Sequence, residues 1–276
     1  MSLDVYANNW VNYPFPHIVI DNYLPENEFK KLSKELESTD TKLQRKFKTA
    51  LENKEIHKDE TLKQNARKLI NNMSSEEIKK FISKKIKSLP LISLGEKKDY
   101  SGYSPFHTTY FGGFLGSHID HSSIENGDLI HVANTIFYAS TEWKKNWGGE
   151  TILFSNNGFF QKVKISPKPN RLIIFIHCAN SWHGVSKYNP KKEVTRKTFY
   201  HDYYISKVHR DNFITCINKN RKNKLTFSTH STTFIPFIPN GINNISLKNF
   251  FLKSNLKYLK VYFIYLINKF FKTDFG

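Results

Sequence analysis

Between residues 103 and 206 the chain is a succession of short apolar or alternating runs, and this pattern limits the fold more than any other feature. The runs are HTTYFGGFL, HVANTIFYAS, ETILF, FFQKVKI, RLIIFIH, WHGVSKY and KTFYHDYYI, and clusters rich in Gly, Asn, Pro and Ser separate them. Runs of this length are typical of β-strands, and the turn residues between them favour antiparallel pairing. We therefore expect an antiparallel sandwich or barrel over this part of the chain.

The residues before this region have a different pattern, which predicts a mostly helical layer preceded by one strand. FPHIVIDNY at 15–23 is a candidate strand, and LPENEFKKLSKELE at 24–37 follows it with apolar residues on one helical face. The lysine-rich stretch 41–72 is expected to form helix and loop. Ser74 and Glu77 then form a candidate capping box for a further helix.

Residues 207–276 are basic and aromatic and form a C-terminal extension to a main domain that we assign to 1–206. A helix is predicted over about 246–272, where apolar residues alternate with lysines. It either packs across the outside of the domain, which we favour, or lies in a membrane interface with its lysines near lipid phosphates. No apolar run approaches the roughly 20 residues that span a bilayer, and the N-terminal residues lack the apolar core of a signal peptide.

The charge and the cysteine content narrow the classes of partner. Lys and Arg number 42 against 24 Asp and Glu, which gives a net charge of +18. Such a charge indicates nucleic acid, an anionic membrane or only a lysine-rich surface; the lysines are scattered, which favours the last of these. Two cysteines, Cys178 and Cys216, exclude a disulfide framework and a cysteine-based zinc site, and they suit the reducing cytoplasm.

Two histidines and one aspartate form a candidate metal site. In SHID, His118 and Asp120 lie two apart, so on a strand both side chains point to the same face. His183 in SWHGV follows the apolar run RLIIFI and can supply a third ligand. Two histidines and one carboxylate hold non-haem Fe(II) and leave positions open. A second His-x-Asp copy, HRD at 209–211, lies in a basic stretch and lacks this context.

Arg196 and Thr198, in TRKTFY, are candidate ligands for a carboxylate-bearing co-substrate. A guanidinium is planar and permanently charged, so it can bind a carboxylate through two parallel hydrogen bonds. Thr198 lies two residues along the same strand face and can add a hydroxyl donor.

The segments that contain these residues resemble the Fe(II)/2-oxoglutarate-dependent dioxygenase superfamily, in its prolyl 4-hydroxylase-like branch. The matching segments, in family order over residues 14–206, are PFPHIVIDNYLP, GGFLGSHID, NTIFYAS, WGGETILF, PNRLIIFIHCANSWHGV and TRKTFYHDYYI. The resemblance implies a mainly β fold with flanking helices: a double-stranded β-helix (jelly roll) core, an N-terminal helical support layer and a C-terminal helical extension. It also implies that His118, Asp120 and His183 bind iron and that Arg196 binds the distal carboxylate of 2-oxoglutarate.

The same resemblance implies further contacts and an activity. Tyr110 and Asn134 are expected near the co-substrate, together with Thr198. The implied reaction uses O₂ and 2-oxoglutarate, with ascorbate as reductant, to hydroxylate a C–H bond and release succinate and CO₂. The substrate is left open among a small metabolite, a glycan or lipid-linked intermediate and a peptidyl residue.

Two other functions remain open at this point. A nucleic-acid oxidative demethylase of the same superfamily is disfavoured, because such enzymes carry a second arginine where this chain has Asp202. A non-catalytic, cupin-like module that binds a metal or a sugar would keep the barrel but would not need Arg196.

Overall fold

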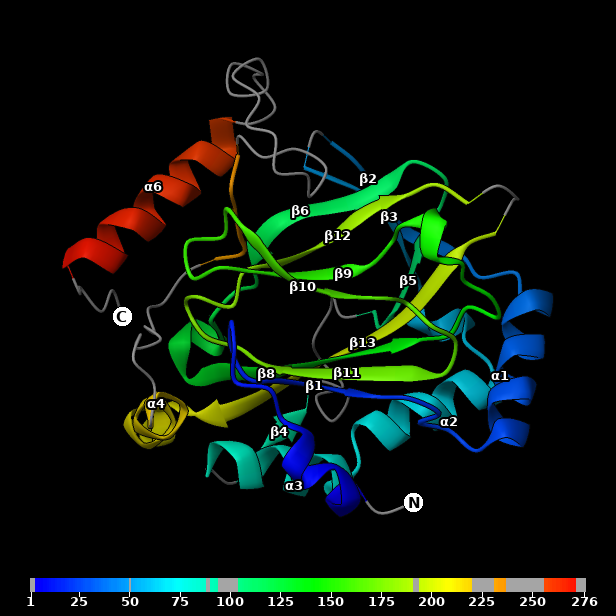
Figure 1. Ribbon diagram of the computed structural model, residues 1–276, viewed down its shortest axis with the longest axis horizontal. Helices are drawn as coiled ribbons and strands as arrows, with labels where there is room; N and C mark the ends of the chain where they lie inside the picture. Colours follow the sequence, from blue (N-terminus) through cyan, green and yellow to red (C-terminus); the bar gives the residue numbers. More distant parts are fainter. Residues whose placement is uncertain are drawn as a thin grey trace.

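One curled antiparallel sheet forms the centre of the molecule. The computed structural model describes residues 3–49, 51–87, 90–93, 104–190, 194–219, 231–236 and 256–271. Ten strands follow one another through the sheet in the order β1-β11-β8-β13-β5-β3-β6-β12-β9-β10. The sheet curls so that β1, β11, β8 and β13 face β6, β12, β9 and β10 across the interior (Figure 1).

The strands of the first layer are β1 (His17–Ile20), β8 (Leu129–Tyr138), β11 (Arg171–Ile176) and β13 (Arg196–Ser206). Those of the second layer are β6 (Gly113–Ile119), β9 (Thr151–Phe154), β10 (Gln161–Ile165) and β12 (His183–Tyr188). The two layers are joined by β3 (Glu52–His57) and β5 (Phe106–Thr109). Four strands pair beside this path, namely β2 (Leu43–Lys48), β4 (Ile92–Ser93), β7 (Ser123–Ile124) and β14 (Thr233–Phe234). The strand-rich region predicted from the sequence is therefore confirmed.

Helices cover the outer face of the first layer, as the sequence predicted (Figure 1). These helices are α1 (Glu26–Ser38), α2 (Gln64–Met73) and α3 (Glu76–Ile86). Each has an apolar face, and its buried residues join those of the first layer in one large apolar cluster. The other helices within the described ranges are α4 (Arg210–Asn218) and α6 (Leu256–Phe271), with short 3₁₀ segments at Leu3–Asn9, Asp59–Thr61, Glu125–Gly127, Lys145–Trp147 and Lys207–His209.

Two local predictions are wrong. The stretch expected to be helix and loop contains the hairpin of β2 and β3. Most side chains of β2 are exposed and half of them are charged, so the hairpin has no apolar period by which it could be recognised. The cap of α3 is Ser75 rather than Ser74: the Ser75 hydroxyl accepts from the Ile78 N–H, whereas the Ser74 hydroxyl donates to the Ile70 carbonyl.

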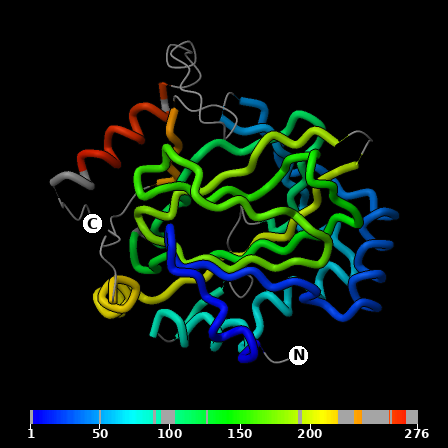
Figure 2. Tube along the Cα trace, in the orientation of Figure 1, coloured from blue at the N-terminus to red at the C-terminus, as the bar shows by residue number. Residues whose placement is uncertain are grey.

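The C-terminal helix α6 packs against the second layer, beside β14 (Figure 2). Tyr258, Leu259, Tyr262 and Tyr265 form its buried face. Of the two arrangements considered from the sequence, packing on the domain is thus observed for 256–271; the rest of the predicted helix lies outside the described residues. None of the helices in the described ranges combines the length and apolarity that a membrane crossing requires.

Candidate functional site

The two histidines of the expected ligand set lie opposite each other on neighbouring strands. His118 is the next-to-last residue of β6, and His183 opens β12, which pairs antiparallel with β6 in the register His183↔His118. Cross-strand partners project from the same face of a sheet, so the imidazoles meet with ring centroids 4.2 Å apart. Asp120 comes directly after β6, on the same side as His118.

The three side chains are spaced as the ligands of one ion. Nε2 of His118 lies 3.4 Å from Oδ1 of Asp120, and Nε2 of His183 lies 3.4 Å from Oδ2 of the same carboxylate. These separations exceed the roughly 2.9 Å of an N–H···O hydrogen bond. They agree with about 3.0–3.4 Å between two atoms that are each roughly 2.1 Å from a common ion. The residues present therefore fit a metal with two imidazole ligands and one carboxylate ligand.

Backbone carbonyls set the tautomer of both histidines. Nδ1 of His118 lies 2.9 Å from the carbonyl oxygen of Gly116, and Nδ1 of His183 lies 3.0 Å from that of Ser181. A carbonyl oxygen only accepts, so each Nδ1 carries the proton and each Nε2 turns its lone pair toward Asp120.

The electrostatics of the three groups also suit a cation. Burial acts to raise the pKa of the Asp120 carboxyl, but the imidazoles of His183 and His118 outweigh it, and this pKa lies well below its ordinary value. Burial, aided by the neighbouring His118, lowers the pKa of His183 to about 4. Asp120 is thus ionised and His183 neutral at pH 7, the protonation states that metal binding requires.

Neighbouring polar groups hold the Asp120 carboxylate in place. Its Oδ2 accepts a hydrogen bond from Nδ2 of Asn134 at 3.1 Å and one from the Tyr200 hydroxyl at 3.2 Å. Asn134 also donates to Oδ1 of Asp202 at 2.9 Å. The structure therefore places Asn134 fully buried behind Asp120, outside the lining of the adjacent cavity.

Arg196 lies at the start of β13 and is buried, with 5% of its surface exposed. Its Nε donates to the Gly149 carbonyl at 2.9 Å, and its guanidinium lies 5.2 Å from the centre of the Tyr138 ring. No carboxylate of the described residues lies within ion-pair distance of this guanidinium. A buried cation without an anionic partner is costly, so the site fits an anionic ligand.

The candidate metal-binding triad, meaning His118, Asp120 and His183, lines one cavity of about 210 Å³ together with Arg196. Thr109, the cross-strand partner of Arg196, lines the cavity, as do Thr198 and Thr151. Tyr110 is 47% exposed and is not among the lining residues. The lining also includes His121, Tyr200 and Asp202, and period-two alternation along β13 from Arg196 places Tyr200 and Asp202 on its face. Lys54 and His107 line the cavity too but were not singled out from the sequence; Lys54 lies on the unrecognised hairpin, which gives no such signal.

A second group of titratable side chains lies beside the triad. Nδ1 of His131 is 2.9 Å from the His121 carbonyl, and its Nε2 is 3.2 Å from the Ala133 carbonyl and 3.4 Å from Oδ1 of Asp202. Both ring nitrogens face acceptors, so His131 is an imidazolium paired with the Asp202 carboxylate. Burial acts to lower the pKa of His131, but Asp202 outweighs it and the pKa is raised.

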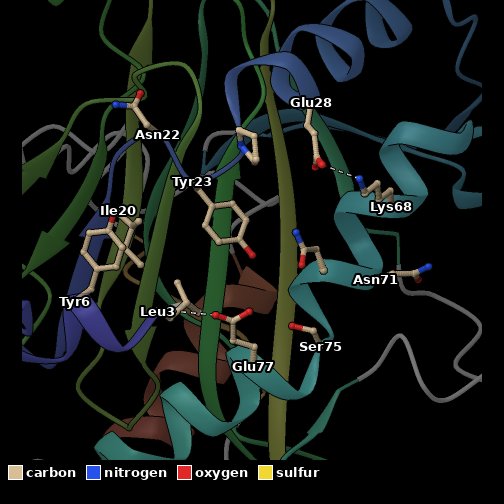
Figure 3. Close-up of a pocket in the computed structure, with 12 residues that line it drawn as sticks. Leu3, Tyr6, Ile20, Asn22, Tyr23, Glu28, Lys68, Asn71, Ser75 and Glu77 are labelled. Carbon is tan, nitrogen blue, oxygen red and sulfur yellow. Dashed lines mark hydrogen bonds and ion pairs between the residues drawn. The ribbon is translucent and has the colours of Figure 1, made fainter. Parts of the chain in front are cut away.

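A larger cavity, of about 540 Å³, lies between the N-terminal 3₁₀ segment, β1 and the helical layer (Figure 3). Its walls include Tyr6 and Tyr23, and an ion pair of 2.8 Å joins Lys68 to Glu28 at one side. Its described lining contains no histidine or cysteine. Of these two cavities, the smaller one is lined by the candidate ligand set.

The family model of the 2OG-Fe(II) oxygenase superfamily matches residues 105–204, the segment that carries the triad and Arg196. This segment is a 2OG-Fe(II) oxygenase domain. The superfamily resemblance and the enzyme class predicted from the sequence, a 2-oxoglutarate-dependent dioxygenase, are confirmed. No curated protein matches the chain.

Solved structures of similar fold align with much of this chain. An oxidoreductase of the 2OG-Fe(II) oxygenase family from Burkholderia pseudomallei is 10% identical, with a TM-score of 0.51 over 74% of this chain and 91% of that one. A prolyl-4-hydroxylase from Pseudomonas putida is 14% identical, with a TM-score of 0.48 over 75% and 97%. HygX from Streptomyces hygroscopicus, solved with nickel and 2-oxoglutarate, is 12% identical, with a TM-score of 0.44 over 73% and 85%. The curled antiparallel sheet and its match to the Burkholderia structure confirm the predicted double-stranded β-helix as the fold.

Proposed function

We propose that this oxygenase hydroxylates a C–H bond of an organic substrate, with Fe(II) bound by His118, Asp120 and His183 and with 2-oxoglutarate oriented by Arg196 and Thr198. The observation that carries the proposal is the buried, carboxylate-free guanidinium of Arg196 in the cavity that also holds the triad. A simple metal-binding or sugar-binding module would not require this cation.

The protein's residues supply binding and orientation. When bound, Fe(II) and 2-oxoglutarate provide the oxidation: one atom of O₂ enters succinate as CO₂ is lost, and the other enters the substrate as a hydroxyl. A triad of two histidines and one carboxylate leaves positions open for a chelating acid and O₂. Nε of Arg196 donates to the Gly149 carbonyl and the guanidinium lies beside the Tyr138 ring, so the Nη groups would form the hydrogen bonds to the distal carboxylate.

The chain offers a matched control for a direct test. Succinate formation from 2-oxoglutarate, with Fe(II), O₂ and ascorbate as reductant, is measured for the wild type, Asp120→Ala and Asp211→Ala. Asp211 belongs to the second His-x-Asp copy and lies at the start of α4, away from the triad. We expect Asp120→Ala to abolish turnover and Asp211→Ala to retain it. Equal turnover in all three proteins would refute the ligand assignment.

The cavity favours a small or partly inserted substrate group. Its volume of about 210 Å³ has to accommodate 2-oxoglutarate as well. The substrate class stays open among a small metabolite, a glycan or lipid-linked intermediate and a peptidyl residue. Nucleic acid is disfavoured because Asp202 stands where nucleic-acid demethylases of the superfamily carry a second arginine. Mass spectrometry of lysate treated with wild type or with Asp120→Ala identifies the product as a gain of one oxygen.

We further propose a cytoplasmic location with peripheral contact to anionic membranes through α6. Its outward face exposes Leu256, Phe263, Ile264 and Ile267. Neither Cys178 nor Cys216 forms a disulfide, which suits a reducing cytoplasm. Apolar side chains flanked by lysines are suited to an anionic lipid interface. Co-sedimentation with phosphatidylserine vesicles should fall for Phe263→Glu; unchanged co-sedimentation would count against the contact.

A further inference from the structure

Each imidazole of the proposed metal site packs against a phenylalanine ring. The ring centroids of Phe175 and His183 are 4.8 Å apart, with an interplanar angle of 54°. Those of Phe234 and His118 are 5.0 Å apart and nearly parallel, with an angle of 20°. Phe175 belongs to the core strand β11, whereas Phe234 lies beyond the segment that matches the oxygenase family.

The short strand β14 fixes Phe234 at this position. It pairs antiparallel with β6 in the register Thr233↔Ile119 and Phe234↔His118, and the Ile235 N–H donates to the Ser117 carbonyl at 3.0 Å. Cross-strand partners share a face, so the Phe234 ring is directed to the side of the sheet on which His118 lies. The pairing therefore completes the edge of β6 next to this ligand.

Helix α6 in turn supports β14 and the strand that carries the other histidine. The Tyr258 ring packs edge-on against Phe234, with centroids 5.3 Å apart. Further along the helix, the Tyr265 ring lies 5.4 Å from Trp182, the residue before His183, and its hydroxyl donates to the Ala179 carbonyl at 2.8 Å. The C-terminal segment, meaning 231–236 and 256–271, thus contacts the surroundings of both imidazoles.

We propose that Phe234 is a positioning residue for the metal ligand His118, so that the C-terminal segment forms part of the metal centre rather than an accessory to it. The inference rests on the proposed ligation by His118. The hydrogen bond from Nδ1 of His118 to the Gly116 carbonyl orients the imidazole. The Phe234 ring, packed on the face of this imidazole, restricts its rotation. Without the ring, Nε2 spends less time directed at the point shared with Asp120 and His183.

The effect should appear in metal affinity before any turnover is measured. Groups that orient a metal ligand typically change metal affinity or activity by about 10–100-fold when they are removed. We therefore expect Phe234→Ala to bind Co(II) about 10-fold more weakly than the wild type, measured on the full chain by titration of the cobalt d–d absorption. Phe234→Tyr keeps the ring and should bind as the wild type does.

The matched control is Ile235→Ala. Ile235 is the next residue, is fully buried, and packs in the separate cluster around Trp182 and Ile119. Ile235→Ala therefore truncates a buried side chain next to β14 that does not pack against His118. Its Co(II) affinity should stay within about twofold of the wild type. If Phe234→Ala does not fold, Phe234→Leu, which removes the planar ring but keeps bulk, is compared with Ile235→Ala instead.

The outcomes separate this inference from the proposed function. Failure of the wild type to bind Co(II), or unchanged binding by Asp120→Ala, would remove the metal site itself. Binding by the wild type that is lost in Asp120→Ala keeps the site. In that case equal affinities of the Phe234 and Ile235 variants would overturn the positioning role, whereas a selective loss in Phe234→Ala that Phe234→Tyr restores would support it.

Discussion

Removal of the Arg196 guanidinium should weaken the apparent binding of 2-oxoglutarate with little effect on the metal. The side chain is buried and has no carboxylate partner within the described ranges, so a bound carboxylate would form a desolvated, charge-assisted pair with it. Truncation of one partner of such a pair costs about 2–5 kcal/mol. A value of about 3 kcal/mol corresponds to roughly a 150-fold rise in the KM for 2-oxoglutarate.

The assay is succinate formation as a function of 2-oxoglutarate concentration, alongside Co(II) titration of the same proteins. Arg196→Lys should recover part of the loss, because an ammonium retains the charge but not the two-pronged geometry. Arg67→Ala is the control, since this arginine pairs with Asp59 on the exposed surface. An unchanged KM in Arg196→Ala would refute the co-substrate assignment, and lost Co(II) binding would point to misfolding instead.

Three further predictions follow from single contacts. Gly149 has φ +77°, and a Cβ added there would lie 2.8 Å from a tyrosine ring; Gly112 has a similar φ of +76°, but a Cβ added there would meet open space. Gly149→Ala should therefore lower Tm more than Gly112→Ala does. Of the two variants, only Gly149→Ala should raise the KM for 2-oxoglutarate. A hydrogen bond from Arg171 lowers the pKa of Asp21, so this pair stabilises the fold at neutral pH and the contribution is lost as pH falls through the lowered value. Because the site is half-exposed, we expect the pair to contribute under about 1 kcal/mol. The difference in Tm between the wild type and Asp21→Asn should therefore shrink at acidic pH. A difference that stays constant with pH would contradict this stabilisation by the ion pair. The Glu35 carboxylate accepts from two backbone N–H groups at the start of α2, and Glu35→Ala should cost about 1–2 kcal/mol in urea unfolding without any change in KM.

The sequence predicted the strands of the core well because their burial follows a simple rule. Strands such as β11 are apolar along their whole length, and turn residues separate them from their neighbours. His118 and Asp120 could be recognised because two-residue spacing at a strand end predicts one shared face. The exact pairing His183↔His118 depends on the register of β6 and β12, which spacing along the chain does not specify.

The parts that the sequence did not predict are those whose residues take their environment from distant segments. The β2 and β3 hairpin is built from charged residues, yet it joins the two layers and brings Lys54 into the cavity lining. Phe234 lies in a two-residue strand, far below the length at which alternation can be detected. Its contact with His118 arises only from pairing with β6, so local patterns contain no trace of it.

The charges around Asp120 link metal binding to the stability of the fold. This partly buried carboxylate faces His183, which is neutral at pH 7, and its neighbour Asp202 is already compensated by the His131 imidazolium. A bound divalent cation would supply the remaining positive charge, and a ligand that binds only the folded state stabilises it by about 4 kcal/mol at 1,000 times its Kd. Co(II) at such an excess should therefore raise the Tm of the wild type by several degrees. Asp120→Ala should show a smaller rise, because it lacks the carboxylate ligand, and Asp211→Ala should respond as the wild type does. An equal rise in Asp120→Ala would show that cobalt acts elsewhere, and the charge argument for this site would then fail.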